Sequence, residues 1–345
     1  MMFIDACYRK PTPRPPVWIM RQAGRYLPEY REIRAKHSFL EMCGQPEVVR
    51  EVTLQPIRRF DMDAAIIFSD ILLPLTPMGL QLRFAQGEGP VIDNPITTEA
   101  DVAALRDPDF SKEMDFLAEA LKITRAELSK DKALLGFCGA PFTLACYAIQ
   151  GHGGGNFDYV RRWIYSNQAT FRALMKKFTL MTVEYLKMQV AAGANAVQIF
   201  DSWGGALSAY DYLQFVFPYV KKIIERTSML GVPRILFVKN ASHFRSFLRT
   251  SEAEVIGLDW TMPMEESRNI LGEDYAIQGN LDPMILFADK DYVVRRTKAM
   301  LEVNYGKPGY IANLGHGIHK ETPIEHVAAF VETVKTFDHA TGPDF

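Results

Sequence analysis

The sequence predicts an α/β fold in which eight parallel strands close into a TIM barrel, (β/α)8, forming a single domain over residues 1–345. Two observations indicate this fold. Eight short apolar runs recur along the chain, and amphipathic helical patterns lie between most of them. No long stretch rich in glycine, serine and proline divides the chain, so we expect one domain rather than two.

The predicted strands are short apolar runs with many β-branched or aromatic residues. In chain order they are Val17–Met20, Ala64–Phe68, Leu134–Phe137, Ala196–Phe200, Ile235–Val238, Val255–Leu258, Tyr275–Ile277 and Tyr310–Ala312. Apolar residues at helical spacing predict helices over Met114–Leu128, Phe171–Val190, Tyr210–Ile224, Phe244–Leu248, Tyr292–Leu301 and Glu325–Phe337. Strands that alternate with helices are typical of a parallel sheet.

Composition narrows the class of protein. The chain is 48% hydrophobic and 23% charged, which is ordinary for a globular protein, and its net charge of −2 gives no positive field for nucleic acid. No apolar run approaches the ~20 residues that span a membrane. The N-terminus has no apolar core long enough for a signal peptide, so we expect a cytoplasmic protein that binds neither nucleic acid nor membrane.

The spacing of the four cysteines and the lack of known metal and nucleotide motifs bear on whether the protein needs a metal or a cofactor. Cys7, Cys43, Cys138 and Cys146 lack the paired spacing of a zinc site, and at this length they do not indicate a disulfide framework. The chain contains no H-E-x-x-H, Walker or dinucleotide-binding motif. We therefore expect chemistry that uses no metal and no cofactor.

The segment at residues 16–34, PVWIMRQAGRYLPEYREIR, is the most unusual part of the sequence. Its apolar run ends abruptly at Arg21, and Arg25 and Arg34 follow later in the same segment. Gly24 allows a tight turn between them. Guanidinium groups bind carboxylate or phosphate in a bidentate way, so the segment indicates an anion site. The alternative is a solvated basic loop with surface ion pairs.

Other polar residues also follow predicted strands, where the active sites of barrels lie. Asp70 has apolar sequence on both sides, so its carboxylate is expected at the base of a pocket, or else as a structural aspartate that caps a helix or pairs with an arginine. His316 lies between two glycines and is either a proton carrier or an ordinary loop histidine. Tyr147 and Ser202 are candidates for binding, and Ser202 is not in a nucleophile elbow.

Several segments together indicate a family. PVWIMRQAGRYLPEYRE, DAAIIFSDIL, GAPFTLACY, GLDW, QGNLDP and YIANLGHGI occur in this order. From about Pro16 to about Phe337 the chain resembles the uroporphyrinogen decarboxylases in these segments. The resemblance implies a single-domain barrel, a homodimer, and no cofactor or metal. It also implies conversion of uroporphyrinogen III to coproporphyrinogen III, in which four ring acetates lose carbon dioxide.

The resemblance also implies roles for particular residues. Arg21, Arg25 and Arg34 would bind substrate carboxylates, and Arg21, Tyr147 and His316 would join Asp70 as catalytic residues, with Asp70 as transition-state stabiliser. The full set of substrate-binding residues would be Arg21, Gln22, Ala23, Gly24, Arg25, Arg34, Asp70, Tyr147, Ser202 and His316, with Arg21 to Gly24 contributing main chain.

The implied reaction needs a proton donor, because protonating a pyrrole carbon creates the electron sink. Arg21 is a poor acid, since a guanidinium stays protonated in proteins. His316 or a protonated substrate carboxylate is chemically easier.

Two other functions compete with this one. Barrel methyltransferases bind zinc through histidine and cysteine at strand ends, but no cysteine follows His316 or lies near the last strand. A porphyrin carrier would keep the arginines without needing Asp70.

Overall fold

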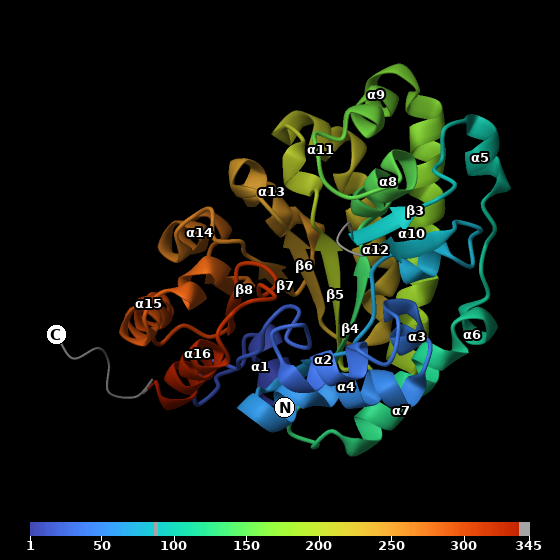
Figure 1. Ribbon diagram of the computed structural model, residues 1–345. Coiled ribbons are helices and arrows are strands. Elements are labelled where there is room, and N and C mark those ends of the chain that lie inside the picture. The colour runs from blue at the N-terminus through green and yellow to red at the C-terminus, as the bar shows by residue number, and fades with distance from the viewer. Residues whose placement is uncertain (86–88, 338–345) are drawn as a thin grey trace.

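The computed structural model describes residues 1–85 and 89–337. Its centre is a curled, fully parallel sheet of seven strands in the order β1-β4-β5-β6-β7-β8-β9, with helices outside it (Figure 1). The strands are β1 (Ala64–Ile66), β4 (Ala133–Gly139), β5 (Ala196–Asp201), β6 (Arg234–Val238), β7 (Val255–Gly257), β8 (Ala276–Leu281) and β9 (Tyr310–Leu314). The predicted α/β class and the barrel-like parallel arrangement are confirmed, and seven of the predicted strands lie where the apolar runs place them.

The eighth predicted strand, Val17–Met20, is wrong as a strand. Only Val17 forms a bridge, in parallel with Ala312 of β9. The same segment also bonds toward β1, because the Asp63 N–H donates to the Val17 carbonyl at 2.9 Å. Pro15 and Pro16 come directly before this run, and a turn follows it, in which the Gln22 N–H donates to the Ile19 carbonyl. The run is therefore too short to form a ladder of hydrogen bonds with a neighbouring strand. It occupies the gap between β9 and β1 without completing the sheet.

The helices lie mainly after the strands. They are α1 (Met2–Cys7), α2 (Pro28–Arg34), α3 (Phe39–Cys43), α4 (Pro46–Phe60), α5 (Glu99–Ala104), α6 (Phe110–Glu113), α7 (Asp115–Glu127), α8 (Pro141–Gln150), α9 (Asp158–Ser166), α10 (Gln168–Ala191), α11 (Ala209–Phe215), α12 (Phe217–Thr227), α13 (Arg245–Leu248), α14 (Met264–Leu271), α15 (Lys290–Glu302) and α16 (Ile324–Thr336). A separate two-stranded antiparallel sheet pairs β2 (Leu82–Ala85) with β3 (Gly89–Ile92). Figure 1 shows β3, α8, α9 and α11 gathered at one end of the sheet.

The predicted helices are confirmed with one break. The pattern over 210–224 forms two helices, α11 and α12, that meet at Val216. Pro218 occupies the second position of α12, where a missing N–H costs nothing, but the same proline cannot continue α11. In the part of the chain that the structure describes, no helix is both long and apolar enough to cross a membrane.

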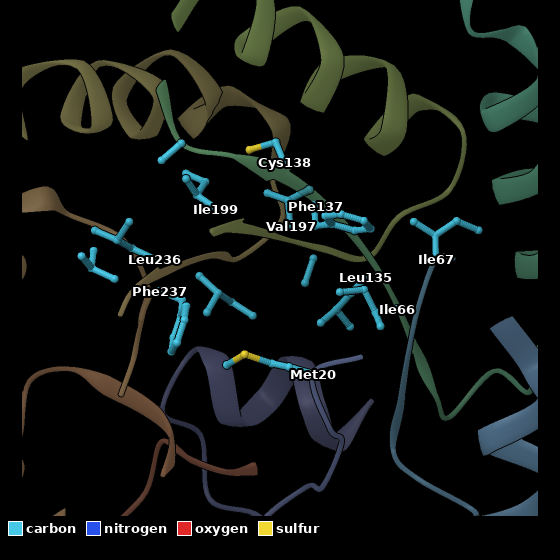
Figure 2. Close-up of a cluster of buried hydrophobic side chains, with 14 of the residues drawn as sticks. Met20, Ile66, Ile67, Leu135, Phe137, Cys138, Val197, Ile199, Leu236 and Phe237 are labelled. Atoms are coloured by element: carbon cyan, nitrogen blue, oxygen red, sulfur yellow. The ribbon is translucent and has the colours of Figure 1, made fainter. Parts of the chain in front are cut away.

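The core inside the curled sheet joins the N-terminal segment to the strands. Figure 2 shows apolar side chains from Met20, β1, β4, β5 and β6 in one cluster. Trp18 is fully buried, and its indole donates to Gln278 Oε1 at 2.8 Å. Gln278 in turn donates to Gln198 at 3.0 Å. This buried polar chain fixes the residues just before Arg21 relative to β8 and β5.

Candidate active site

Seven side chains form a closed ring of neighbours beyond the strand ends, here called the rim ring. They are Arg21, Asp70, Tyr147, Trp203, Lys239, Trp260 and His316. Each belongs to the loop or helix that follows a strand, or to the turn after Val17–Met20. The carboxyl ends of parallel strands meet at one end of a barrel, which is why residues far apart in sequence meet here.

Arg21 occupies the turn that ends the N-terminal apolar segment. Its backbone has φ 61°, and its side chain is exposed. The side chain runs along Gly317, where an added Cβ would lie 2.5 Å from Arg21 Cδ. Glycine at 317 therefore allows the guanidinium stem to pass close to the loop that carries His316. The loop sequence Gly-His-Gly has a packing reason as well as a chemical one.

Asp70 presents a partly buried carboxylate to Arg21. Its Oδ1 accepts the Leu72 N–H at 2.8 Å. Burial raises the pKa of this carboxyl above its ordinary value, while the Leu72 N–H and the Arg21 cation act in the opposite direction. Asp70 thus has a structural role, because its Oδ1 accepts a hydrogen bond from its own loop, while Oδ2 can accept hydrogen bonds from other groups.

Tyr147 lies beside Asp70 at the start of the aromatic side of the rim ring. Burial, and then the negative charge of Asp70, raise the pKa of its phenol to about 12. The phenol therefore stays protonated at neutral pH and offers a hydrogen-bond donor. Its ring packs at 6.3 Å from that of Trp203. A substrate group between Asp70 and Tyr147 would meet one acceptor and one donor.

His316 lies on the opposite side, with its ring 6.0 Å from Phe237 and 6.3 Å from Trp260. Burial lowers the pKa of the imidazole to about 3, and the cations of Arg21 and Lys239 lower it further in the same direction. At neutral pH the imidazole is neutral. It can donate or accept a hydrogen bond, but it carries no extra proton to give, in contrast to the expectation that it is the easier acid.

Lys239 completes the rim ring, and the sequence reasoning assigned it no role. Its Nζ lies 5.8 Å from the ring centres of both Trp203 and Trp260. The signal available in the sequence was a lysine directly after the buried strand β6. Its meaning depends on two tryptophans that come from the loops after β5 and β7, and their meeting is a property of the fold.

Buried carboxylates hold both tryptophans in place. Asp201 accepts the Thr143 hydroxyl at 2.7 Å and the Tyr212 hydroxyl at 3.0 Å. The Thr143 hydroxyl oxygen also accepts the backbone N–H of Trp203 at 3.2 Å. Burial raises the pKa of Asp201 to about 6 against the effect of these hydrogen bonds. The carboxyl thus connects β5, α8 and α11 directly beneath Trp203.

Asp259 does the same for Trp260. It is fully buried and accepts the Thr261 N–H at 2.8 Å and the Ala241 N–H at 3.2 Å. Arg245, itself 1% exposed, approaches it at 3.4 Å. Ala241 is two residues beyond Lys239, so this carboxylate ties together the two loops that hold Lys239 and Trp260.

The other predicted substrate-binding residues lie away from these contacts. The Gln22 side chain is buried; it accepts from the Ile19 N–H at 3.2 Å and donates to the Ala64 carbonyl at 3.1 Å. Only its main chain is left to line a site, and Ala23 and Gly24 beside it are half-buried. The side chain of Gln22 instead fastens the turn to β1.

Arg25 and Arg34 share one side of the segment, since both act electrostatically on Tyr30. Arg25 is exposed, while Arg34, also exposed, donates to the His37 carbonyl at 2.7 Å. Ser202 is half-buried between Asp201 and Trp203. The structure thus brings Arg21, Asp70, Tyr147 and His316 into one electrostatic group, and Arg25, Arg34 and Ser202 do not act on that group.

Cysteine and metal-ligand positions give a separate observation. Cys7, Cys43, Cys138 and Cys146 are all free and buried. Across residues 1–85 and 89–337, no group of three or more histidine, cysteine, aspartate or glutamate side chains is placed to hold a metal ion.

The lowered pKa of His316 predicts a pH-dependent stability. An unfolded histidine has a pKa of ~6.5, so below that pH the unfolded chain binds a proton that the folded site refuses. Stability is therefore lost as the pH falls from about 6.5 toward the folded value of about 3. Replacing His316 by asparagine is expected to reduce the drop in Tm between pH 7 and pH 4.5 by roughly 2–4 °C. Calorimetry at the two pH values measures this, with the exposed His152→Asn variant as control, and equal drops in wild type and His316→Asn would contradict it.

Comparison with known proteins agrees with the geometry. The model of the family described as "Uroporphyrinogen decarboxylase (URO-D)" matches residues 2–337. The uroporphyrinogen decarboxylase of Geotalea uraniireducens is 47% identical over 332 residues, covering 96% of this chain and 97% of the relative. That of Carboxydothermus hydrogenoformans is 48% identical, covering 96% and 95%.

Solved structures share the fold. A methyltransferase from Methanosarcina mazei superposes with a TM-score of 0.82 at 19% identity, covering 96% of each chain. A B12-independent methionine synthase from Shewanella sp. W3-18-1 gives a TM-score of 0.57 at 10% identity, covering 87% of this chain and 88% of the other. At these identities the likeness concerns the fold alone. The family model and the curated relatives carry the assignment, and by them this chain belongs to the uroporphyrinogen decarboxylase family.

Proposed function

We propose that this protein removes the four acetate carboxyl groups of uroporphyrinogen III to give coproporphyrinogen III, with no added metal or cofactor. The observation that carries the proposal is the pairing of a partly buried carboxylate, Asp70, with the Arg21 guanidinium at one end of the barrel. The substrate has carboxylates at its periphery and four pyrrole N–H groups at its centre. A site with a cation at its wall and an acceptor at its floor matches both features.

Asp70 is the acceptor for the centre of the substrate. Pyrrole N–H groups that converge on an ionised carboxylate make charge-assisted hydrogen bonds. The same carboxylate stabilises the ring cation that forms when a pyrrole carbon is protonated, in the manner of an oxyanion hole with the signs reversed. Because burial raises the pKa of Asp70, activity is expected to be lost on the acid side at a higher pH than for an ordinary aspartate.

Arginines hold the periphery of the substrate. Arg21, Arg25 and Arg34 are exposed, so their guanidinium groups can meet acetate or propionate carboxylates, although Arg34 also donates to the His37 carbonyl. Tyr147 adds a hydroxyl donor, Ser202 a second hydroxyl, and His316 a neutral imidazole. The substrate supplies its own electron sink once protonated, which removes the usual need of decarboxylases for a cofactor.

The proposal extends to the assembly and location of the protein. We propose a homodimer, as the family resemblance implies, and a cytoplasmic location. Four free, buried cysteines suit a reducing compartment. Light scattering coupled to size exclusion measures the mass of the assembly, and a mass of one chain, 39.1 kDa, would contradict the dimer.

Product analysis tests the function. Purified protein, treated with a chelator, is incubated anaerobically with uroporphyrinogen III, and the products are oxidised and separated by chromatography. We expect coproporphyrin as the final product. A protein that binds the substrate without turnover would instead be a porphyrin carrier. Stoichiometric zinc in the untreated protein, with activity lost on chelation, would favour a zinc methyltransferase.

Replacing Arg25 by alanine is expected to raise KM for uroporphyrinogen III about five- to tenfold with kcat little changed. The exposed guanidinium makes a carboxylate contact that is equally strong in substrate and transition state, and loss of such binding appears in KM. Initial rates over a range of substrate concentration measure both constants. Arg226→Ala is the matched control, because this exposed arginine lies in the last turn of α12, before β6 begins, at the opposite end of the sheet from the rim ring. An unchanged KM in Arg25→Ala would show that Arg25 faces away from the substrate.

A further inference from the structure

Lys239 is a lysine held between two aromatic rings with no carboxylate beside it. Its Nζ is 5.8 Å from the ring centres of both Trp203 and Trp260, a distance at which a cation is attracted to the face of an indole. In the part of the chain that the structure describes, no aspartate or glutamate oxygen lies within the 4.0 Å of an ion pair with it. The ammonium group thus has aromatic neighbours on two sides and no ion-pair partner among these residues.

The charged and titratable groups around Lys239 come from three neighbouring segments. Arg21 and His316 face it across the rim ring, and Asp259 lies behind it at the end of β7. Burial lowers the pKa of the ammonium group, Arg21 lowers it further, and Asp259 opposes both. The group is half-buried, and its lowered pKa means that it releases its proton more easily than a free lysine does.

The other rim groups are poorer acids at neutral pH. The His316 imidazole, with a pKa of about 3, has no proton to spare, and the Tyr147 phenol has a pKa of about 12. A guanidinium such as Arg21 stays protonated. A general acid works best when its pKa lies near the working pH. Lys239 is the cationic acid of the rim ring that comes nearest to this condition.

We propose that Lys239 is the general acid that protonates the pyrrole carbon, with the two tryptophans holding its ammonium group at the edge of the substrate. This inference rests on the proposed function and names the proton donor of that same site. Arg21 then binds and orients a carboxylate, and Asp70 balances the charge that forms on the ring.

The proton and electron balance of each decarboxylation closes with Lys239 in this role. An N–H bond of the ammonium group breaks and a C–H bond forms at the pyrrole α-carbon next to the carbon that bears the acetate, leaving a neutral amine and a cationic ring. The C–C bond to the carboxylate then breaks, its electron pair enters the ring as an exocyclic double bond, and carbon dioxide leaves. A proton from water converts the exocyclic carbon to a methyl group, and the neutral amine takes back the ring proton. One proton from solvent is consumed for each carbon dioxide released.

Two substitutions separate an acid from a carboxylate-binding cation. Lys239→Arg keeps the positive charge between the tryptophans but cannot release a proton at neutral pH. It is expected to lower kcat at least about 100-fold, the usual share of a general acid, while KM changes less than about threefold. Lys239→Met keeps the apolar stem and loses charge and proton together, and it is expected to lower kcat at least as far. Lys298→Arg, on the exposed side of α15, is the matched control and should leave both constants unchanged.

The pH profile of kcat gives a readout that a structural role would not move. Wild-type kcat is expected to fall at alkaline pH as the ammonium group loses its proton, at a pH below the ordinary lysine value because its pKa is lowered. Arg21→Gln removes a cation that lowers this pKa, so its alkaline limb is expected to move to higher pH. In Lys239→Arg the limb is expected to disappear from the accessible range.

Three outcomes would overturn the inference. A Lys239→Arg variant with kcat within about threefold of wild type would show that charge alone is needed. A Lys239→Met variant with raised KM and unchanged kcat would make Lys239 a carboxylate ligand. An alkaline limb that stays in place in both Arg21→Gln and Lys239→Arg would assign that limb to another group. Wild-type protein without decarboxylase activity would instead remove the proposed function itself, and these outcomes presuppose an active wild type.

Discussion

Replacing Asp70 by alanine is expected to lower kcat for uroporphyrinogen III by about 100- to 1000-fold. The carboxylate is the only negative side chain of the rim ring, and in the proposed function its charge stabilises the ring cation of the substrate. Removing one preorganised electrostatic group of this kind typically costs ~3 kcal/mol or more in the barrier. Anaerobic incubation followed by chromatography of the oxidised products measures the loss as coproporphyrin formed per unit time.

Asp70→Asn is the sharper variant, because it separates charge from local structure. Asn Oδ1 can still accept the Leu72 N–H that Asp70 accepts at 2.8 Å, so the loop after β1 keeps its bond. The expected result is a kcat as low as in Asp70→Ala with a Tm close to that of wild type. A purely structural cap predicts the reverse pattern, in which Asp70→Asn is nearly as active as wild type while Asp70→Ala is unstable. Near-normal coproporphyrin formation by both variants would remove Asp70 from the mechanism.

Replacing Asp63 by alanine is expected to destabilise the fold by about 3 kcal/mol, because the partly buried Arg14 cation loses its carboxylate and the buried Val17 N–H loses its acceptor. The Asp63 carboxylate accepts hydrogen bonds from Nη1 and Nη2 of Arg14, at 2.7 and 2.9 Å. It also accepts the Val17 N–H at 2.7 Å. These bonds fasten the N-terminal segment to the start of β1, where no strand completes the sheet.

The loss should also reach the active site. The segment that Asp63 holds continues through Trp18 to Arg21, so a looser segment places the guanidinium less accurately. Chemical denaturation measures the stability. The control is Asp93→Ala, which removes an exposed pair with Arg83, and it is expected to cost less than about 1 kcal/mol. Equal stability of Asp63→Ala and Asp93→Ala would show that the Arg14–Asp63 pair does not hold the gap closed.

The strands of the sheet could be predicted from sequence because each is an apolar run with helices on either side. Val17–Met20 has the same composition but ends in a turn, and only its pairing with β9 and Asp63 reveals its place. The two-stranded β2–β3 sheet was missed because its strands pair only with each other and mix polar with apolar residues. Helix α4 was missed because Pro56 and several charged residues interrupt its apolar pattern.

The candidate site was predictable where a residue type is unusual in its local sequence. Arg21 after an apolar run and His316 between glycines are such cases, and both lie in the rim ring. The burial of a site residue, and therefore its pKa, cannot be predicted from its local sequence. The neutral state of His316 depends on its surroundings and on Arg21 and Lys239, which come from distant segments. The Gln22 side chain likewise binds β1 through the Ala64 carbonyl, which is 42 residues away in sequence.

Counting carbon dioxide tests the account most directly. Wild-type protein, freed of metal with a chelator, is incubated anaerobically with uroporphyrinogen III labelled in its acetate carboxyl groups, beside Asp70→Asn at equal concentration. The account predicts four labelled carbon dioxide molecules per substrate and coproporphyrinogen as product from wild type, with almost none from Asp70→Asn over the same time. Folded wild-type protein that releases no label, or an Asp70→Asn variant that releases it at the wild-type rate, would contradict the account.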